Sequence, residues 1–198
     1  MHRFIETIRL ENGHLSNLDY HQTRMNHAFR EFFHGQPVID INYFLSTCPM
    51  PNVGLHKVRI VYDTEVQSVQ ISSYKIKEIK TLRIVNGDSI SYSHKFEDRG
   101  ELEKLFDLRQ NSEDIIVVKD GELTDASFAN LTFKKADRWF TPSNFLLNGT
   151  MRQQLLDKGL IEEATILVED LGNYEKVKLI NAMLLFDGPE IDVSQIVE

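Results

Sequence analysis

Cysteine is almost absent from the sequence, because Cys48 is the single cysteine among 198 residues. One cysteine cannot form an internal disulfide bond, so the chain does not belong to the disulfide-stabilised class of secreted domains. This cysteine usage is typical of a reducing compartment, and we expect a cytoplasmic protein. We interpret Cys48 as a small apolar side chain rather than as a nucleophile.

Positive charge is also scarce. The chain has 22 lysine and arginine residues against 30 aspartate and glutamate residues, which gives a formal net charge of −8. Nucleic-acid binding depends on a surface that neutralises phosphates, and this composition does not supply one. No stretch approaches the roughly 20 apolar residues of a membrane-spanning helix, and the N-terminal residues MHRFIETIRL have no long apolar core. We therefore expect neither nucleic acid nor a membrane as partner.

Several catalytic motifs are missing. The sequence contains no G-x-S-x-G, G-x-x-x-x-G-K or G-x-G-x-x-G pattern, so a hydrolase elbow, a P-loop and a dinucleotide-binding turn are not indicated. No two of the seven histidines are four residues apart. We expect no acidic or cysteine partner to complete a ligand set around the histidines, which include His14, His21, His27 and His34. The sequence therefore predicts no metal site.

The N-terminal half alternates between strand and helix patterns. Hydrophobic residues make up 41% of the chain, enough to bury a core in one large domain or two small ones. FIETIRLENGHLS predicts two strands around the turn ENG, and Leu18, Met25, Phe29 and Phe32 then recur at helical spacing. A short helical stretch ended by prolines follows. The alternating segments HKVRIVYD, SVQISSYKI and TLRIVNG predict sheet strands.

The C-terminal half is rich in predicted strands. GELEKLFDLRQNS indicates a helix, DIIVVKDGELTDAS a hairpin that turns at Asp120-Gly121, and ANLTFKKADRWFTPS a second hairpin. LLNGTMRQQLLDKGL predicts a turn and a helix, with NGT available as caps and Gly159 at the C-terminal end. ATILVED predicts another strand, and the apolar stretch VKLINAMLLF follows it.

These patterns predict an α+β protein of two lobes. The run IKEIKTLR is the best candidate for a junction, although no Gly/Ser-rich linker marks it. We place the boundary near residue 78, with a small N-terminal α/β lobe over 1–78 and a larger strand-rich lobe over 79–198.

The residues that could perform chemistry form a dispersed pattern. Its parts are DYHQTRM with Arg24, SHKFEDR with Lys95, TDASFANLTF with Asp125 and Asn130, then NGTMRQ and INAM. From Phe4 to about Pro189 these motifs resemble, in the same order, fold-type IV pyridoxal-phosphate enzymes of the class IV aminotransferase family. That family includes D-amino acid aminotransferase, branched-chain aminotransferase and aminodeoxychorismate lyase, and HKFEDR, NGTMRQ and INAM are most similar to the lyase.

The resemblance implies the cofactor pyridoxal 5'-phosphate, with 79–198 as the cofactor-binding lobe, and a role for each matching residue. Lys95 is implied as the catalytic lysine that binds the cofactor, since a partly desolvated amine beside a cationic ring has a lowered pKa. Asp125 would face the pyridine nitrogen, where the family usually has glutamate. The phosphate would lie at the helix start after Gly149. The implied cofactor-binding set is Arg24, Lys95, Asp125, Ser127, Phe128, Gly149, Thr150, Asn181 and Ala182.

The resemblance further implies a homodimeric lyase that converts 4-amino-4-deoxychorismate to 4-aminobenzoate and pyruvate in folate biosynthesis. A class IV aminotransferase acting on D- or branched-chain amino acids uses the same residues, and a non-catalytic pyridoxal-phosphate-binding homologue is a third interpretation. The acidic turn DTEVQS replaces an arginine-glycine loop that the family uses for substrate carboxylates. The family's additional N-terminal strand is also missing before Phe4, so either the chain is short by nature or its start codon is late.

Each matching residue also has a plain structural interpretation. Lys95 could be a surface charge, Asp125 a residue that satisfies a turn, and Arg24 part of a solvated helix face. Asn148-Gly149 could be only a turn, and Asn181 only a polar residue at a strand end.

Overall fold

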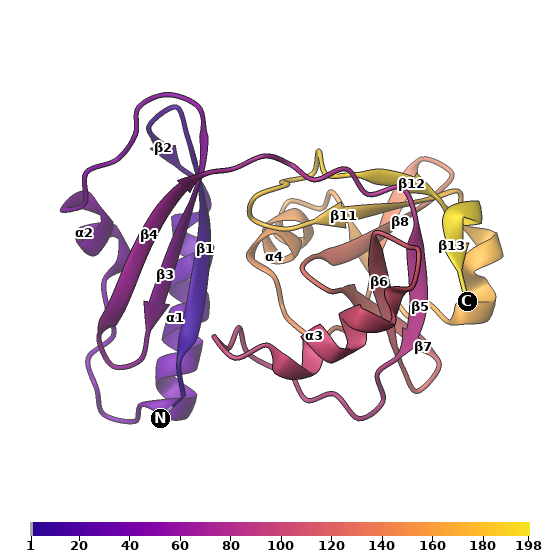
Figure 1. Ribbon diagram of the computed structural model, residues 1–198, viewed down its shortest axis with the longest axis horizontal. Helices are drawn as coiled ribbons and strands as arrows, with labels where there is room; N and C mark the ends of the chain where they lie inside the picture. The colour runs from indigo at the N-terminus through magenta and orange to yellow at the C-terminus, as the bar shows by residue number, and fades with distance from the viewer. Residues whose placement is uncertain (1) are drawn as a thin grey trace. The chain divides into compact units, whose positions relative to one another are not determined.

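The computed structural model describes residues 2–198. By contacts the chain divides into two compact units (Figure 1). The first unit runs to Ile76 and also contains His94–Asp98, and the second contains Lys77–Ser93 and Arg99–Glu198. Residues 94–98, which the sequence assigned to the second lobe, thus belong to the first unit. The predicted α+β class with two lobes is confirmed, whereas a domain boundary near residue 78 stays a prediction.

The first unit is a small antiparallel sheet with a helix on one face (Figure 1). Four strands are paired in the order β2-β1-β3-β4. The elements are β1 (Phe4–Glu11), β2 (His14–Leu15), α1 (Leu18–Phe32), α2 (Ile41–Ser46), β3 (Leu55–Tyr62) and β4 (Val66–Ser73). Met25 and Phe29 of α1 pack against Phe4, Ile8 and Ile60 of the sheet, because the helical spacing of apolar residues gives α1 one buried face.

The second unit is built on a nine-stranded mixed sheet. Seven strands follow the order β10-β9-β8-β7-β6-β5-β13, and β11 pairs with β8 and β12. The strands are β5 (Leu82–Asn86), β6 (Asp114–Lys119), β7 (Glu122–Ala126), β8 (Asn130–Lys135), β9 (Arg138–Pro142), β10 (Glu162–Ala164), β11 (Lys176–Ile180), β12 (Glu190–Asp192) and β13 (Ile196–Val197). The helices are α3 (Gly100–Phe106) and α4 (Thr150–Asp157), with the 3-10 turns η1 (Asp107–Arg109), η2 (Val168–Asn173) and η3 (Val193–Gln195).

Two predicted turns in this unit are confirmed. Asp120 and Gly121 have φ angles of 52° and 81° and join β6 to β7, as expected of a two-residue hairpin turn whose backbone favours positive φ. Gly159 has a φ of 64° just after α4, the left-handed position that ends a helix.

The predicted strand ATILVED is wrong. β10 ends at Ala164, and residues from Val168 onward form η2. The carboxylate of Asp170 accepts a hydrogen bond from the backbone N–H of Leu167 at 3.2 Å, and the N–H of Val168 donates to the carbonyl of Gly121. These bonds turn the backbone where the apolar pattern alone indicated extended chain.

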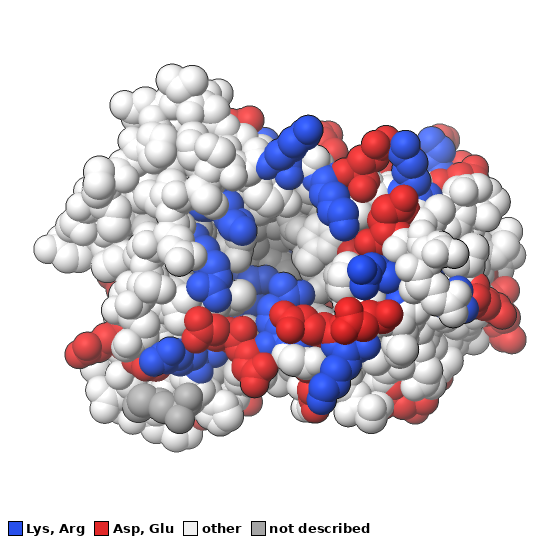
Figure 2. Space-filling view, viewed as in Figure 1, with Lys and Arg blue, Asp and Glu red and all other residues white. Residues whose placement is uncertain are grey.

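The surface of the first unit is largely uncharged over α2 and β2 (Figure 2). Exposed apolar side chains in this part of the chain include Tyr43, which is 73% exposed, and Val53, which is 79% exposed. Within residues 2–198, no helix combines the length and the apolar character needed to cross a bilayer.

Candidate functional site

The predicted site residues fall into two groups, one in each unit. Arg24 and Lys95 belong to the first unit. The second unit contains the other seven, Asp125, Ser127, Phe128, Gly149, Thr150, Asn181 and Ala182. Each group is built by its own unit's elements.

The segment that carries Lys95 is bound to the start of β1. The backbone N–H of Ile5 donates to the carbonyl oxygen of Lys95 at 2.9 Å, and the N–H of Glu97 donates to the carbonyl of Arg3 at 2.8 Å. Phe96 pairs antiparallel with Phe4 between these bonds. Residues 94–98 therefore extend the sheet of the first unit, which fixes the backbone of Lys95 although no regular strand was predicted there.

Arg24 is held by a buried carboxylate. Its Nε donates to Glu6 Oε1 at 2.9 Å and its terminal nitrogen donates to Glu6 Oε2 at 2.5 Å, a bidentate pair. His21 Nδ1 lies 2.5 Å from the same Oε2. Glu6 and His21 have no exposed side-chain surface, and Arg24 has little. This contradicts the interpretation of Arg24 as part of a solvated helix face.

The charges around Glu6 fix its protonation. Burial acts to raise the pKa of Glu6, but Arg24 and the hydrogen bond from His21 together lower it to about 2. Burial lowers the pKa of His21, with opposing contributions from Glu6 and a smaller lowering from the charge of Lys95. Near neutral pH, Glu6 is thus an anion, His21 is neutral and donates through Nδ1, and Arg24 is oriented by them.

Sequence analysis missed Glu6 and His21 as members of this group. The signal was present in the alternation of β1, since Phe4, Glu6, Ile8 and Leu10 share one face and all are buried. A carboxylate on such a face requires a cationic or hydrogen-bonding partner. A helix that packs on that face, with an arginine on it, could supply that partner.

In the second unit, Asp125 anchors a loop. This carboxylate is 5% exposed. Its Oδ1 accepts from Asn130 Nδ2 at 2.7 Å, and its Oδ2 accepts from the backbone N–H groups of Leu146 and Leu147, both at 2.9 Å. Asp125 thus satisfies a turn, as in its plain structural interpretation. A carboxylate offers about four lone-pair positions, so one remains for a further donor.

Burial dominates the titration of Asp125. It raises the pKa of this carboxyl to about 6, against smaller lowering by the hydrogen bonds from Leu147, Asn130 and Leu146 and by the charge of Arg152. N–H dipoles at hydrogen-bond distance stabilise the anion less than a paired guanidinium does.

Asn130 connects Asp125 to the start of α4. Its Nδ2 also donates to the carbonyl of Leu147 at 2.8 Å. A Cβ at Gly149 would lie 2.0 Å from Asn130 Oδ1, so only glycine fits at that position without a shift. Gly149 is the N-cap of α4 and no side chain caps this helix. The adjacent Thr150 is 4% exposed, and its Oγ1 has no hydrogen-bond partner within the described chain.

The remaining predicted residues lie around the turn that follows β7. Ser127 Oγ donates to Asp114 Oδ2 at 3.0 Å, and the Ser127 carbonyl accepts from Arg99 at 2.6 Å. Asn181 Nδ2 donates to the carbonyl of Phe128 at 3.1 Å, which joins the end of β11 to this turn. Ala182 follows in the turn that Asn181 closes by accepting from the N–H of Met183 and Leu184.

Comparison with known proteins identifies the class of the fold. A family model for class IV amino-transferases matches residues 102–186. A crystal structure from Haemophilus somnus, of a protein proposed to be a 4-amino-4-deoxychorismate lyase, has a TM-score of 0.87 at 33% identity and covers 92% of this chain and 97% of that one. A structure from Mesorhizobium loti, of a proposed amino-acid aminotransferase, has a TM-score of 0.80 at 19% identity and covers 100% and 99% of the two chains.

A relative in sequence extends over nearly the same length. An uncharacterized protein of Haemophilus influenzae is 38% identical over 185 residues, which are 92% of this chain and 98% of that protein. The chain belongs to the class IV aminotransferase family, with its fold-type IV arrangement of a small antiparallel sheet and a larger mixed sheet. The family is pyridoxal-phosphate-dependent.

The start of α4 fits the phosphate of that cofactor. A helix N-terminus without a side-chain cap presents N–H groups and a positive dipole end to an anion. The buried, unpartnered hydroxyl of Thr150 lies at the same end, and a buried hydroxyl without a partner is costly unless a ligand satisfies it. The residues of the second unit therefore have the donors that a phosphate group requires.

Proposed function

We propose that this protein is a pyridoxal-phosphate-dependent lyase that converts 4-amino-4-deoxychorismate to 4-aminobenzoate and pyruvate. The observation that carries the proposal is the uncapped start of α4 with the unpartnered Thr150 hydroxyl, in the position where the family binds phosphate. The choice of a lyase is supported by the Haemophilus somnus protein at 33% identity, which is proposed to be such an enzyme.

In this proposal each matching residue has the role that the family resemblance implies. Thr150 and the first N–H groups of α4 hold the phosphate, and Arg24, oriented by Glu6, supplies a positive charge. Lys95 would bind the cofactor covalently, and the remaining lone pair of Asp125 would accept a hydrogen bond from its pyridine nitrogen.

Lys95 also moves the proton in the proposed reaction. The bound cofactor supplies an electron sink for the substrate's amino-bearing carbon. The substrate amine would take the place of the Lys95 amine on the cofactor, and the freed Lys95 amine would then take the proton from that ring carbon. The bond between the ring and the enolpyruvyl oxygen would break, and the ring would become aromatic. The enolpyruvate takes up a proton and leaves as pyruvate, so neither water nor an oxidant is consumed.

Covalent attachment is tested first. Protein loaded with pyridoxal phosphate is reduced with borohydride, digested and mapped, and we expect the label on Lys95. The Lys95→Arg variant is the matched control and should carry no label. A label on Lys57 or Lys75, or no label at all, contradicts the assignment.

Turnover then separates the activities. Chorismate, glutamine and an aminodeoxychorismate synthase generate the substrate, and 4-aminobenzoate and pyruvate are measured together, with Lys95→Ala as control. Amino transfer from D-alanine or a branched-chain amino acid without either product would favour an aminotransferase, as the name proposed for the Mesorhizobium loti protein suggests. No turnover with either set, despite a labelled Lys95, would indicate a non-catalytic pyridoxal-phosphate-binding protein.

We further propose a homodimer that acts on a small amino substrate in the cytoplasm. The single cysteine agrees with a reducing compartment. The exposed apolar side chains near α2, Val38, Tyr43 and Val53, support burial against a second copy. Light scattering after gel filtration should give twice the chain mass for wild type. A double variant with Tyr43→Asp and Val53→Asp should have a lower mass. A monomeric wild type contradicts the proposal.

A further inference from the structure

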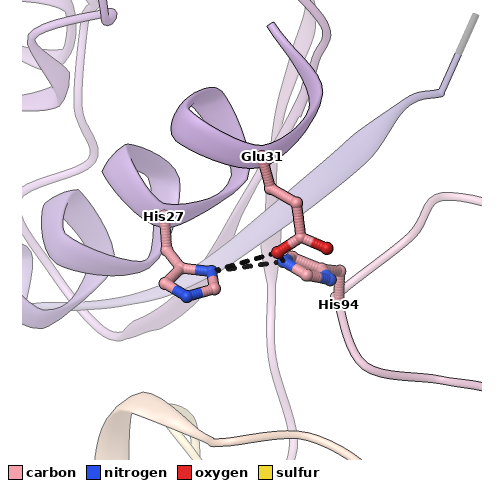
Figure 3. A group of neighbouring side chains, drawn as sticks. All are labelled: His27, Glu31 and His94. Atoms are coloured by element: carbon pink, nitrogen blue, oxygen red, sulfur yellow. Dashed lines mark hydrogen bonds and ion pairs between the residues drawn. The ribbon is translucent and has the colours of Figure 1, made fainter. Parts of the chain in front are cut away.

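Three ligand-bearing side chains that have no role in the groups assigned above converge within the first unit. His27 and Glu31 lie one turn apart on α1, and His94 comes from the segment that pairs with the start of β1 (Figure 3). The nitrogen and oxygen atoms that they direct toward one another all lie within 4.8 Å. Sequence analysis predicted no metal site because His94 is 63 residues beyond Glu31 in the chain.

The distances match the edges of a metal coordination sphere. His27 Nδ1 lies 3.3 Å from His94 Nε2, His94 Nε2 lies 3.3 Å from Glu31 Oε2, and His27 Nδ1 lies 3.9 Å from the same oxygen. Tetrahedral zinc with bonds of about 2.0–2.2 Å to nitrogen and oxygen separates its ligand atoms by roughly 3.4 Å. Two of the three edges agree, and a small rotation of the exposed Glu31 side chain shortens the third.

A hydrogen-bond network satisfies these three atoms less well. When the two facing nitrogens carry one proton between them, two lone pairs face each other, and when each nitrogen carries a proton, two N–H groups face each other. A cation at the centre interacts with all three atoms at once. Two imidazole nitrogens with one carboxylate oxygen are a donor set that zinc commonly takes, with water in the fourth position.

The ring of His94 is already oriented for this role. It packs edge-on against Phe32, with ring centroids 4.9 Å apart at 81°, and its ring also contacts Phe4 and Phe96.

We propose that His27, Glu31 and His94 bind one zinc ion, with solvent as the fourth ligand. The ion would join the segment of Lys95 to α1, which carries Arg24 three residues before His27. The site belongs to the first unit alone, so the proposal does not rest on the proposed lyase activity. Zinc would therefore bind the protein whether or not pyridoxal phosphate is present.

The test uses untagged, chelator-treated, pyridoxal-phosphate-free protein titrated with zinc chloride by calorimetry in competition with a chromophoric chelator. We expect one zinc per chain. His27→Ala and Glu31→Gln alter exposed side chains of α1 and should weaken binding at least 10- to 100-fold, the loss seen even when an outer-sphere partner of a metal is removed. His34→Ala and His14→Ala remove other exposed histidines and are the matched controls, with unchanged affinity.

The visible spectrum of bound cobalt(II) provides a second measurement, and a loss of folding would not produce the same spectrum. Wild-type protein should show the intense visible bands of tetrahedral cobalt, and zinc should abolish them in a one-to-one titration. Circular dichroism of each variant verifies the fold. Absence of saturable one-to-one binding in wild type, or equal affinity in wild type, His27→Ala and Glu31→Gln, would overturn the proposal.

Discussion

Glu6 in the first unit and Asp125 in the second are both carboxylates within α+β cores, yet their pKa values move in opposite directions. Glu6 is surrounded by a guanidinium and an imidazole, and its pKa falls to about 2. Asp125 receives three N–H groups from neutral amides, and its pKa rises to about 6. Each carboxylate has three such contacts, and the main difference is the formal charge at hydrogen-bond distance. A buried acid is kept ionised by a paired cation much more firmly than by dipoles.

The largest effect is expected from removing the charge of Glu6. In Glu6→Gln the guanidinium of Arg24 loses its buried anion, and breaking such a pair costs about 3–5 kcal/mol. Urea unfolding followed by circular dichroism measures the loss. The matched control is Glu162→Gln, which breaks an exposed pair with Arg138 and should cost less than about 1 kcal/mol. Equal losses in the two variants would show that Glu6 is not held by charge.

The dependence on pH should separate the two carboxylates. Since the pKa of Glu6 is lowered on folding, its stabilisation is present above about pH 4.5 and is lost as the pH falls toward 2. Since the pKa of Asp125 is raised on folding, its contribution to the free energy of unfolding is fully present below about pH 3.8 and is lost as the pH rises through 6. Two pKa units correspond to about 3 kcal/mol across each window.

The difference in the free energy of unfolding between wild type and each variant, measured from pH 2 to 8, tests this contrast. The excess stability of wild type over Glu6→Gln should decrease as the pH falls. Its excess stability over Asp125→Asn should decrease as the pH rises toward neutral. The single tryptophan, Trp139, lies in the second unit, so its fluorescence follows the unit of Asp125. Parallel pH profiles for the two variants would refute the opposite shifts.

Asp125→Asn should have a smaller effect on stability. The new amide oxygen can still accept from Leu146 and Leu147, but its NH₂ group faces the NH₂ group of Asn130. One unmade buried hydrogen bond costs about 1–3 kcal/mol. Tryptophan fluorescence in urea measures it, while the substrate assay should show turnover lower by about 10² if the remaining lone pair serves the cofactor. Normal turnover with lowered stability would leave Asp125 as a loop anchor only.

The smallest change in stability is expected at Thr150. Thr150→Val replaces a buried hydroxyl that has no hydrogen-bond partner among residues 2–198, so the free energy of unfolding should change by less than about 1 kcal/mol. Affinity for pyridoxal phosphate should nonetheless fall about 10- to 150-fold, since a hydrogen bond to a charged group contributes about 1.5–3 kcal/mol. Fluorescence titration with pyridoxal phosphate measures this, with Thr150→Ser as the control that restores the hydroxyl. Unchanged affinity would remove Thr150 from the phosphate site.

Local patterns predicted most of the fold because they depend on neighbouring residues. The spacing of Leu18, Met25 and Phe29 predicted α1, and Asp120-Gly121 predicted a hairpin, and both are confirmed. The strand predicted over ATILVED failed because the side chain of Asp170 and the carbonyl of Gly121 bind the backbone there. Apolar alternation does not reveal such bonds.

The site was predicted less completely. Motif order predicted Arg24, Asp125 and Thr150 as site residues, which stays a prediction, and it did not indicate what each one contacts. Glu6 binds Arg24 across 18 positions of sequence, and His94 meets His27 across 67. Pairings at such separations follow from how the segments pack, so periodicity within either segment does not predict them.

The addition of residues 94–98 to β1 has a consequence for synthesis on the ribosome. The chain leaves the first unit after Ile76, returns at His94 and leaves again after Asp98. At about 5–20 residues per second, the ribosome needs a second or more to make those intervening residues. Until then the start of β1 presents an open edge that other chains can pair with. We expect nascent chains that stop at residue 76 to bind holdase chaperones, and chains that extend past 98 and clear the exit tunnel to be released from them.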